Sequence, residues 1–151
     1  MSKWNFLYEI QESIDFDLSF KSDRVTLTNR NTGAHIDIFE DEFSIKETEE
    51  SFTEYIVEFS TQHRHLEELS EVEEYVRSIL ADKILPIEFY YNGERRFGGE
   101  ILQADYVQLS IEHLATLFGY TTEYLSQFDF EVHSWSGKYD ITRGQADDFY
   151  E

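Results

Sequence analysis

The chain has 151 residues, of which 12 are Lys or Arg and 32 are Asp or Glu, so its formal net charge is −20. Its 13 Phe, 10 Tyr and 2 Trp exclude a disordered acidic tail, because such tails lack the aromatic residues that build a core. The absence of Cys excludes a disulfide scaffold and a Cys-ligated zinc site, and the shortage of bases excludes a free-standing nucleic-acid binder.

The length predicts a single domain over residues 1–151. The chain has one Pro and 7 Gly, and no linker rich in Ser, Gly or Pro interrupts it. The apolar stretch at the N-terminus breaks at Glu9 and lacks a small-residue cleavage site, so we expect no signal peptide. No apolar run approaches the roughly 18 residues of a membrane span. We therefore expect a cytoplasmic protein.

The first part of the chain has the alternating pattern of β-strands. Ser2 is expected to cap a helix over residues 3–13. Apolar residues then alternate with polar ones over residues 15–20, 24–28, 35–39 and 53–59, which predicts strands there. The run Glu40-Asp41-Glu42 is predicted to be an acidic turn leading to Phe43 and Ile45. The sum is an antiparallel meander with short connections.

The second part mixes helices and hairpins. Apolar residues at helical spacing predict a helix over residues 70–82, with Ser70 and Glu73 as its capping box. Asn92-Gly93 predicts a hairpin between strands at residues 87–91 and 97–102. Helices are expected over residues 110–118 and 122–127, and strands over residues 128–133 and 138–142. The fold class is α+β: a mostly antiparallel sheet of about 8–10 strands with two to four helices packed on it.

Residues 110–128 resemble the helix-turn-helix of bacterial transcription regulators. Ala115 occupies the position of the small residue at the helix crossing, Gly119 that of the turn, and Leu125 that of the inward residue of the second helix. The resemblance implies DNA binding, but the segment contains no Lys or Arg. Phosphate contacts supply most of the non-specific affinity for DNA. A regulator is therefore the third and least favoured of the functions considered.

No chemical motif predicts an enzyme. His63-Arg64-His65 would suit a divalent metal only if both His lay on one face of a strand, and the segment is predicted to be a loop. Arg95-Arg96 is interpreted as a charged turn in preference to an anion site. Nucleophile elbows, glycine-rich phosphate loops and calcium loops are missing from the sequence. We predict no catalytic residue, no cofactor and no metal site.

The remaining signal is the placement of the carboxylates on outward strand positions and turns. One interpretation is a solvated face that keeps strand edges from pairing, and a halophilic origin would also produce such a charge. The other is a surface shaped for a basic partner, since so large a net charge works against the compact state. The predicted partner-binding residues are these acids, with two exposed aromatic anchors: Asp37, Glu40, Asp41, Glu42, Glu88, Asp129 and Glu131, with Tyr90 and Trp135.

These patterns favour a non-enzymatic acidic protein that docks a basic protein. One form is a bacterial immunity or antitoxin-like inhibitor of a basic nuclease, and a related form mimics nucleic acid against a DNA-binding protein. The alternative is a small-molecule-binding or enzymatic α+β domain with an aromatic-lined pocket. The sequence predicts neither a membrane partner nor direct contact with nucleic acid.

Overall fold

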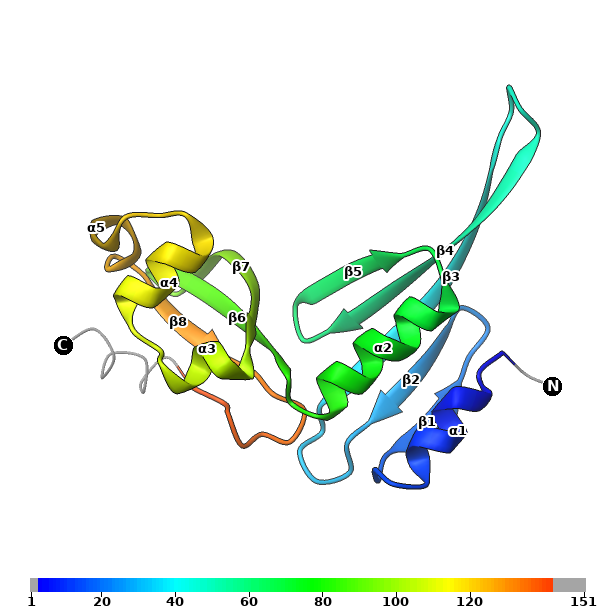
Figure 1. Cartoon of the computed structure of the whole chain (residues 1–151), viewed down its shortest axis with the longest axis horizontal. Helices are drawn as coiled ribbons and strands as arrows, with labels where there is room; N and C mark the ends of the chain where they lie inside the picture. Colours follow the sequence, from blue (N-terminus) through cyan, green and yellow to red (C-terminus); the bar gives the residue numbers. More distant parts are fainter. Residues whose placement is uncertain (1–2, 143–151) are drawn as a thin grey trace.

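The computed structural model describes residues 3–142, apart from the side chain of Ile45, and has an α+β fold with two antiparallel sheets (Figure 1). The elements in chain order are α1 (Asn5–Gln11), β1 (Asp17–Phe20), β2 (Arg24–Thr28), β3 (His35–Ile45), β4 (Glu50–Phe59), β5 (Gln62–Leu66), α2 (Leu69–Leu80), β6 (Ile84–Tyr91), β7 (Glu94–Leu102), α3 (Gln103–Val107), α4 (Ile111–Phe118), α5 (Thr122–Leu125) and β8 (Asp129–Val132). The predicted fold class is confirmed.

The first sheet is the predicted meander, with strand order β1-β2-β3-β4-β5. Helices α1 and α2 lie against the sheet, and together they enclose one hydrophobic cluster (Figure 1). Alternate residues of β2, β3 and β4, such as Leu27, Ile36 and Val57, are buried there against Val76 and Ile79 of α2. Ser2, the expected cap of α1, lies outside the described residues.

Strands β3 and β4 are longer than the strands beside them. In the first sheet, β2 pairs with residues 35–39 of β3, and β5 pairs with residues 55–59 of β4. Residues 40–45 and 50–54 therefore continue as a two-stranded arm that projects beyond the rest of the sheet (Figure 1). The predicted turn at Glu40-Asp41-Glu42 is wrong, because these residues stay in register with β4 and the chain reverses only after Ile45.

Two further local expectations change in this part of the chain. The segment His63-Arg64-His65 is not a loop but the centre of β5, because it pairs with β4 across a tight turn. Helix α2 takes Glu68 as its N-cap, and Glu71 completes the capping box in place of the predicted Ser70 pair. The side chain of the N-cap residue accepts free backbone N–H groups of the first turn. Which residue becomes the N-cap therefore depends on where the chain leaves β5.

The second sheet has the order β7-β6-β8 and its own hydrophobic cluster. Leu85, Ile87 and Phe89 of β6 face that cluster, which α4 and α5 help to close. Gly119 ends α4 with a φ of 74°, the left-handed conformation that glycine adopts without strain, as its position predicts. Helix α3 was not predicted, since it has only five residues and no helical period to detect.

After β8 the chain returns to the first sheet. Residues 138–142 do not form the predicted strand, and only a single bridge joins Ile141 to Val132. Trp135 inserts into the hydrophobic cluster of the first sheet, where it contacts the rings of Phe16 and Phe59. Asn29 donates a hydrogen bond from Nδ2 to the carbonyl of Trp135 at 2.7 Å.

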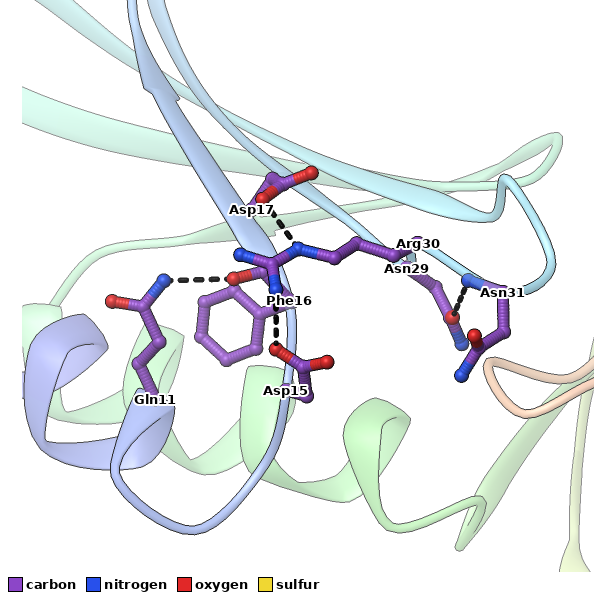
Figure 2. A network of polar contacts seen from close by, with 7 residues as sticks. All are labelled: Gln11, Asp15, Phe16, Asp17, Asn29, Arg30 and Asn31. Atoms are coloured by element: carbon purple, nitrogen blue, oxygen red, sulfur yellow. Dashed lines mark hydrogen bonds and ion pairs between the residues drawn. The ribbon is translucent and has the colours of Figure 1, made fainter.

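Figure 2 shows how polar contacts shape the β2–β3 turn that receives this segment. The Oδ1 atom of Asn29 accepts the backbone N–H of Asn31 at 2.9 Å. Arg30 reaches back across β1 and pairs with Asp15 at 3.1 Å and with Asp17 at 2.6 Å. These two carboxylates raise the pKa of the Arg30 guanidinium above its ordinary value, chiefly because Arg30 donates a hydrogen bond to Asp17. No helix in residues 3–142 is both long and apolar enough to cross a membrane.

Candidate functional site

The arm formed by β3 and β4 exposes a pair of phenylalanines. Phe43 and Phe52 lie directly opposite each other in the β3–β4 register, and their rings stack with centroids 5.5 Å apart and an interplanar angle of 24°. Phe43 is 47% exposed and Phe52 is 40% exposed. Aromatic side chains gain most when they are buried, so an exposed pair on a projecting ribbon is a feature of interaction surfaces.

Acidic residues surround this pair. Asp41 and Glu54 form the adjacent cross-strand pair on the same face of the arm, and Glu50 follows toward the tip. A groove of about 360 Å³ separates the arm from the start of α2, and no basic residue lines it. The groove is lined by Phe43, Phe52, Thr53, Glu54, Glu67 and Glu68. Its apolar floor and acidic rim suit a cationic, partly apolar segment.

The predicted acids at the base of the arm have different surroundings. Asp41 and Glu42 are exposed, as expected. Glu40 is half-buried and forms an ion pair with Lys3, and this hydrogen bond raises the pKa of the Lys3 ammonium group. Asp37 is buried, which corrects its predicted outward position: Thr26 of the neighbouring strand donates a hydrogen bond to its Oδ1 at 2.5 Å. An interior strand shields its polar side chains with those of its neighbours.

Glu88 is also not on the surface, where the sequence predicts it. It is fully buried, forms an ion pair with Arg95 and accepts a hydrogen bond from Gln62 Nε2 at 2.9 Å. The opposite residue in β7 is Gly98, and a Cβ there would lie 2.9 Å from the Glu88 carboxylate. The missing side chain at Gly98 thus makes room for the carboxylate, and Gln62 of β5 covers it.

The other predicted contacts lie close to Glu88 or in the core. Glu131 is directly opposite Glu88 in the β6–β8 register, and its Oε2 atom is buried without a hydrogen-bond partner in residues 3–142. Tyr90 and Asp129 form the next pair of that register and are half-buried. Trp135 is only 3% exposed, so it is a core residue and not the exposed anchor that was predicted. The sequence did not indicate that the segment after β8 packs on the first sheet.

A second carboxylate, which is half-buried, joins the two sheets. Glu100 of β7 accepts a hydrogen bond from Arg64 of β5 at 2.5 Å and another from the Tyr75 hydroxyl of α2. Burial, together with the hydrogen bond to Glu100, raises the pKa of the Tyr75 hydroxyl well above its ordinary value. The Arg64 guanidinium lies 4.0 Å from the centre of the Tyr75 ring. This cluster therefore serves the packing of the sheets, and its charges are already balanced.

The arginines in the described part of the chain are balanced by neighbouring acids. Each arginine between residues 3 and 142 pairs with a carboxylate: Arg24, Arg30, Arg64, Arg77, Arg95 and Arg96. In the segment that resembles a helix-turn-helix, Ala115 and Leu125 are buried as that motif requires, but α5 has only four residues. In this structure α4 and α5 pack together against the hydrophobic cluster of the second sheet.

Two histidines of β5 lie beside a carboxylate of the arm. His63 and His65 lie on one face of β5 with their rings 5.3 Å apart, and His65 Nδ1 lies 2.6 Å from Glu54 Oε1. Within residues 3–142, however, no three His, Cys, Asp or Glu side chains are placed to hold an ion together. The pair of histidines borders the arm next to Glu54.

An aromatic pocket on the second sheet is the other candidate. It is open to solvent and has a volume of about 450 Å³. Phe97 is its centre, since it stacks on Tyr124 with an interplanar angle of 16° and meets Phe128 edge-on. The pocket is lined by Tyr91, Arg96, Phe97, Tyr124, Gln127 and Phe128. It combines flat apolar faces with the polar groups of Arg96 and Gln127.

Comparison with known proteins assigns no family to this chain. No family model matches it, and no curated protein or solved structure matches it either. The function must therefore be argued from the two candidate surfaces. None of the six residues that line the groove on the arm was among the predicted partner-binding residues. The available signal was the acidic residues on both sides of the two phenylalanines, within one hairpin.

Proposed function

We propose that this protein is a non-enzymatic binding protein that docks a basic partner protein, and that the arm of β3 and β4 makes the main contact. One observation carries the proposal: the exposed, stacked pair Phe43 and Phe52 borders a groove rimmed by Glu54, Glu67 and Glu68. Aromatic residues at the centre of an interface supply most of its affinity, and charged residues around them supply steering and specificity.

The electrostatics of the whole chain support the same sign of partner. The net charge is −20, and the described arginines are all paired with carboxylates. The net charge of the chain therefore speeds the association of a basic protein and slows that of an acidic one. Salt screens this attraction over about 10 Å at 0.1 M ionic strength, so the association rate should fall as salt rises.

The concrete form we favour is an inhibitor that covers the working surface of a basic toxin or nuclease, as immunity and antitoxin proteins do. A projecting arm reaches a concave site on the partner, and its acids take the place of the phosphates that such a site binds. Mimicry of nucleic acid against a DNA-binding protein uses the same chemistry.

The test is capture of a partner on immobilised protein at low salt, with elution by a salt gradient. The wild-type protein should retain a basic protein that elutes as salt rises, whereas the Phe43→Ser, Phe52→Ser double variant should not retain it. The Phe20→Ser variant is a matched control, because Phe20 is 47% exposed and stacked on Tyr8 but lies on β1. Capture that ignores salt, or that survives in the arm variant, would overturn the proposal.

A small-molecule-binding function is the second candidate, because the aromatic pocket around Phe97 is a specific feature that supports it. Its flat rings suit a planar or sugar-like ligand, with Arg96 and Gln127 as polar partners. A thermal-shift screen that finds ligands for the wild-type protein but none for Tyr124→Ala would favour this function over partner docking.

A further inference from the structure

The edge of β4 on the arm is open to another strand. In the first sheet β5 pairs with residues 55–59 of β4, and within the described residues no strand pairs with residues 50–54 on that side. The chain leaves the line of β5 at Glu67 and Glu68 to begin α2. An unpaired edge of this kind is a template on which an extended peptide can add as a further strand.

The parity of the β4–β5 hairpin indicates which backbone groups face this edge. Gln62 follows Phe59 after a two-residue turn, and residues that directly flank such a turn exchange backbone hydrogen bonds with each other. Along a strand, the N–H and C=O groups of successive residues point to opposite edges. Ser51 and Thr53 are an even number of residues from Phe59, so their groups point to the same edge as those of Phe59. Their N–H and C=O groups therefore point to the open edge, whereas the side chain of Phe52 lies on the face that stacks with Phe43.

The groove beside this edge selects the side chains of the added strand. The residue opposite Phe52 in an added antiparallel strand would lie over the phenylalanine pair, and its neighbours on that face would lie near Glu50 and Glu54. A Lys or Arg at these positions would place its stem on the aromatic rings and its charge among the acids. A strand with a basic residue at every second position would therefore place all its basic side chains on the face of the arm that carries Phe52, Glu50 and Glu54.

Charge also distinguishes the two edges of the arm. The β3 edge begins beside Lys3, which pairs with Glu40, and a pocket lined partly by Lys21 and Arg24 lies there. The groove at the β4 edge has acidic, apolar and hydroxyl side chains in its lining and no base. A basic strand is repelled less at the β4 edge than at the β3 edge.

We propose that the basic partner contacts this protein through an extended segment with alternating Lys or Arg, which adds as an antiparallel strand to residues 50–54 of β4. The added strand continues the line of β5, and its basic side chains occupy the groove over Phe43 and Phe52. This inference rests on the proposed function and specifies the element of the partner that docks.

The test uses a defined probe, an acetylated and amidated peptide of about seven residues in which valine alternates with lysine or arginine. The peptide is titrated into isotope-labelled full-length protein while amide resonances are recorded. The amide signals of Ser51 and Thr53 should shift together and gain protection from hydrogen exchange. Shifts confined to other parts of the protein would overturn the inference.

Two N-methylated analogues of the peptide separate strand addition from plain charge attraction. Residues opposite Phe52 direct their N–H away from β4, so N-methylation of the basic residues should leave binding nearly unchanged. N-methylation of the valines removes the N–H groups that face the arm and should weaken binding about tenfold or more. Equal weakening by both analogues, or by neither, would overturn strand addition.

Charge variants of the protein test the proposed function separately. Glu67→Gln removes a charge from the groove and should weaken the peptide severalfold at low salt, whereas Glu74→Gln, an exposed acid on α2 outside the groove, should not. If Glu67→Gln has no effect and salt does not weaken binding, the proposed function itself fails. If charge matters but the two N-methylated analogues behave alike, only the strand model fails.

Discussion

Glu88 and Arg95 form an ion pair in which the carboxylate is fully buried while the guanidinium side chain remains 43% exposed. The two members therefore depend on each other unequally. Arg95 can turn to water when Glu88 is removed, but Glu88 loses its countercharge when Arg95 is removed and keeps only the hydrogen bond from Gln62.

The Arg95→Ala variant should be clearly less stable than the wild-type protein. Removing one member of a buried pair costs about 3–5 kcal/mol, because an uncompensated charge stays behind. Glu88→Gln should cost less, about 1 kcal/mol, since a neutral amide replaces the charge. Urea unfolding measures both, with Arg96→Ala as the control: Arg96 pairs with the exposed Glu94, so its loss should cost about 0–1 kcal/mol. Equal losses at Arg95 and Arg96 would contradict this interpretation.

The Trp135→Ala variant should lose about 3–5 kcal/mol of unfolding free energy, as large aromatic truncations in a core do. The indole is 3% exposed, contacts Phe16 and Phe59, and belongs to the cluster of the first sheet although it follows the last strand of the second. Thermal unfolding should show a lower midpoint, and hydrogen exchange should rise in both sheets. A matched truncation, Tyr8→Ala on the exposed face of α1, should change stability far less.

The pH dependence of the unfolding free energy should reveal the contribution of the Asp105 carboxylate. The backbone N–H of Leu102 donates to its carboxylate at 2.9 Å and His113 lies at the same distance, and these contacts, with Leu102 first, lower the pKa of Asp105. A carboxyl group with a depressed pKa stabilises the fold at any pH above its unfolded value, which is 3.8 here, and that stabilisation disappears as the pH falls through the lowered folded value.

Asp105→Ala should therefore cost about 1 kcal/mol at pH 7, as the loss of a helix cap does, and the difference from the wild type should shrink to near zero at strongly acidic pH. Unfolding in urea over a pH series measures it. Asp23→Ala, an exposed acid that pairs only with the adjacent Arg24, is the control and should show no such pH-dependent difference. A difference for Asp105→Ala that is independent of pH would show that the charge is unimportant.

A substitution on the arm should affect the stability of the fold much less than it affects binding of the basic partner. Phe43→Ser should cost about 0.5–1 kcal/mol of stability, because only the exposed stacking with Phe52 is lost. Its effect on the basic partner should be far larger, a loss of affinity of about tenfold or more, as for an aromatic residue central to an interface. Titration calorimetry and urea unfolding of the same variant separate the two effects. Weakened binding that only follows lowered stability would contradict the role of Phe43.

The elements that the sequence predicts correctly are those whose signal is local. The apolar period of α2, the alternation of β1 and β2 and the left-handed stop at Gly119 each depend on neighbouring residues. Helix α3 and strand β5 escaped prediction for the same reason: α3 is too short to show a period, and β5 has polar residues where a strand next to the core would be apolar.

The candidate site on the arm depends on pairing between residues that are far apart in the sequence. Glu40-Asp41-Glu42 has the composition of a turn, yet it lies within a strand because residues more than ten positions away continue the ladder. The predicted acids therefore separate into exposed ones on the arm, such as Asp41 and Glu42, and buried ones, such as Asp37 and Glu88.

By itself the sequence determined the α+β class, most helices and strands, and the sign of the surface charge, because periodicity and composition are properties of short segments and of sums. Only the tertiary structure decided which carboxylates reach solvent and that two phenylalanines meet on a projecting arm. Burial of Glu88 requires Gly98 opposite it and Gln62 from another sheet, and exposure of Phe43 requires that β2 end short of it. Both conditions depend on which segments, far apart in the sequence, lie side by side in the fold.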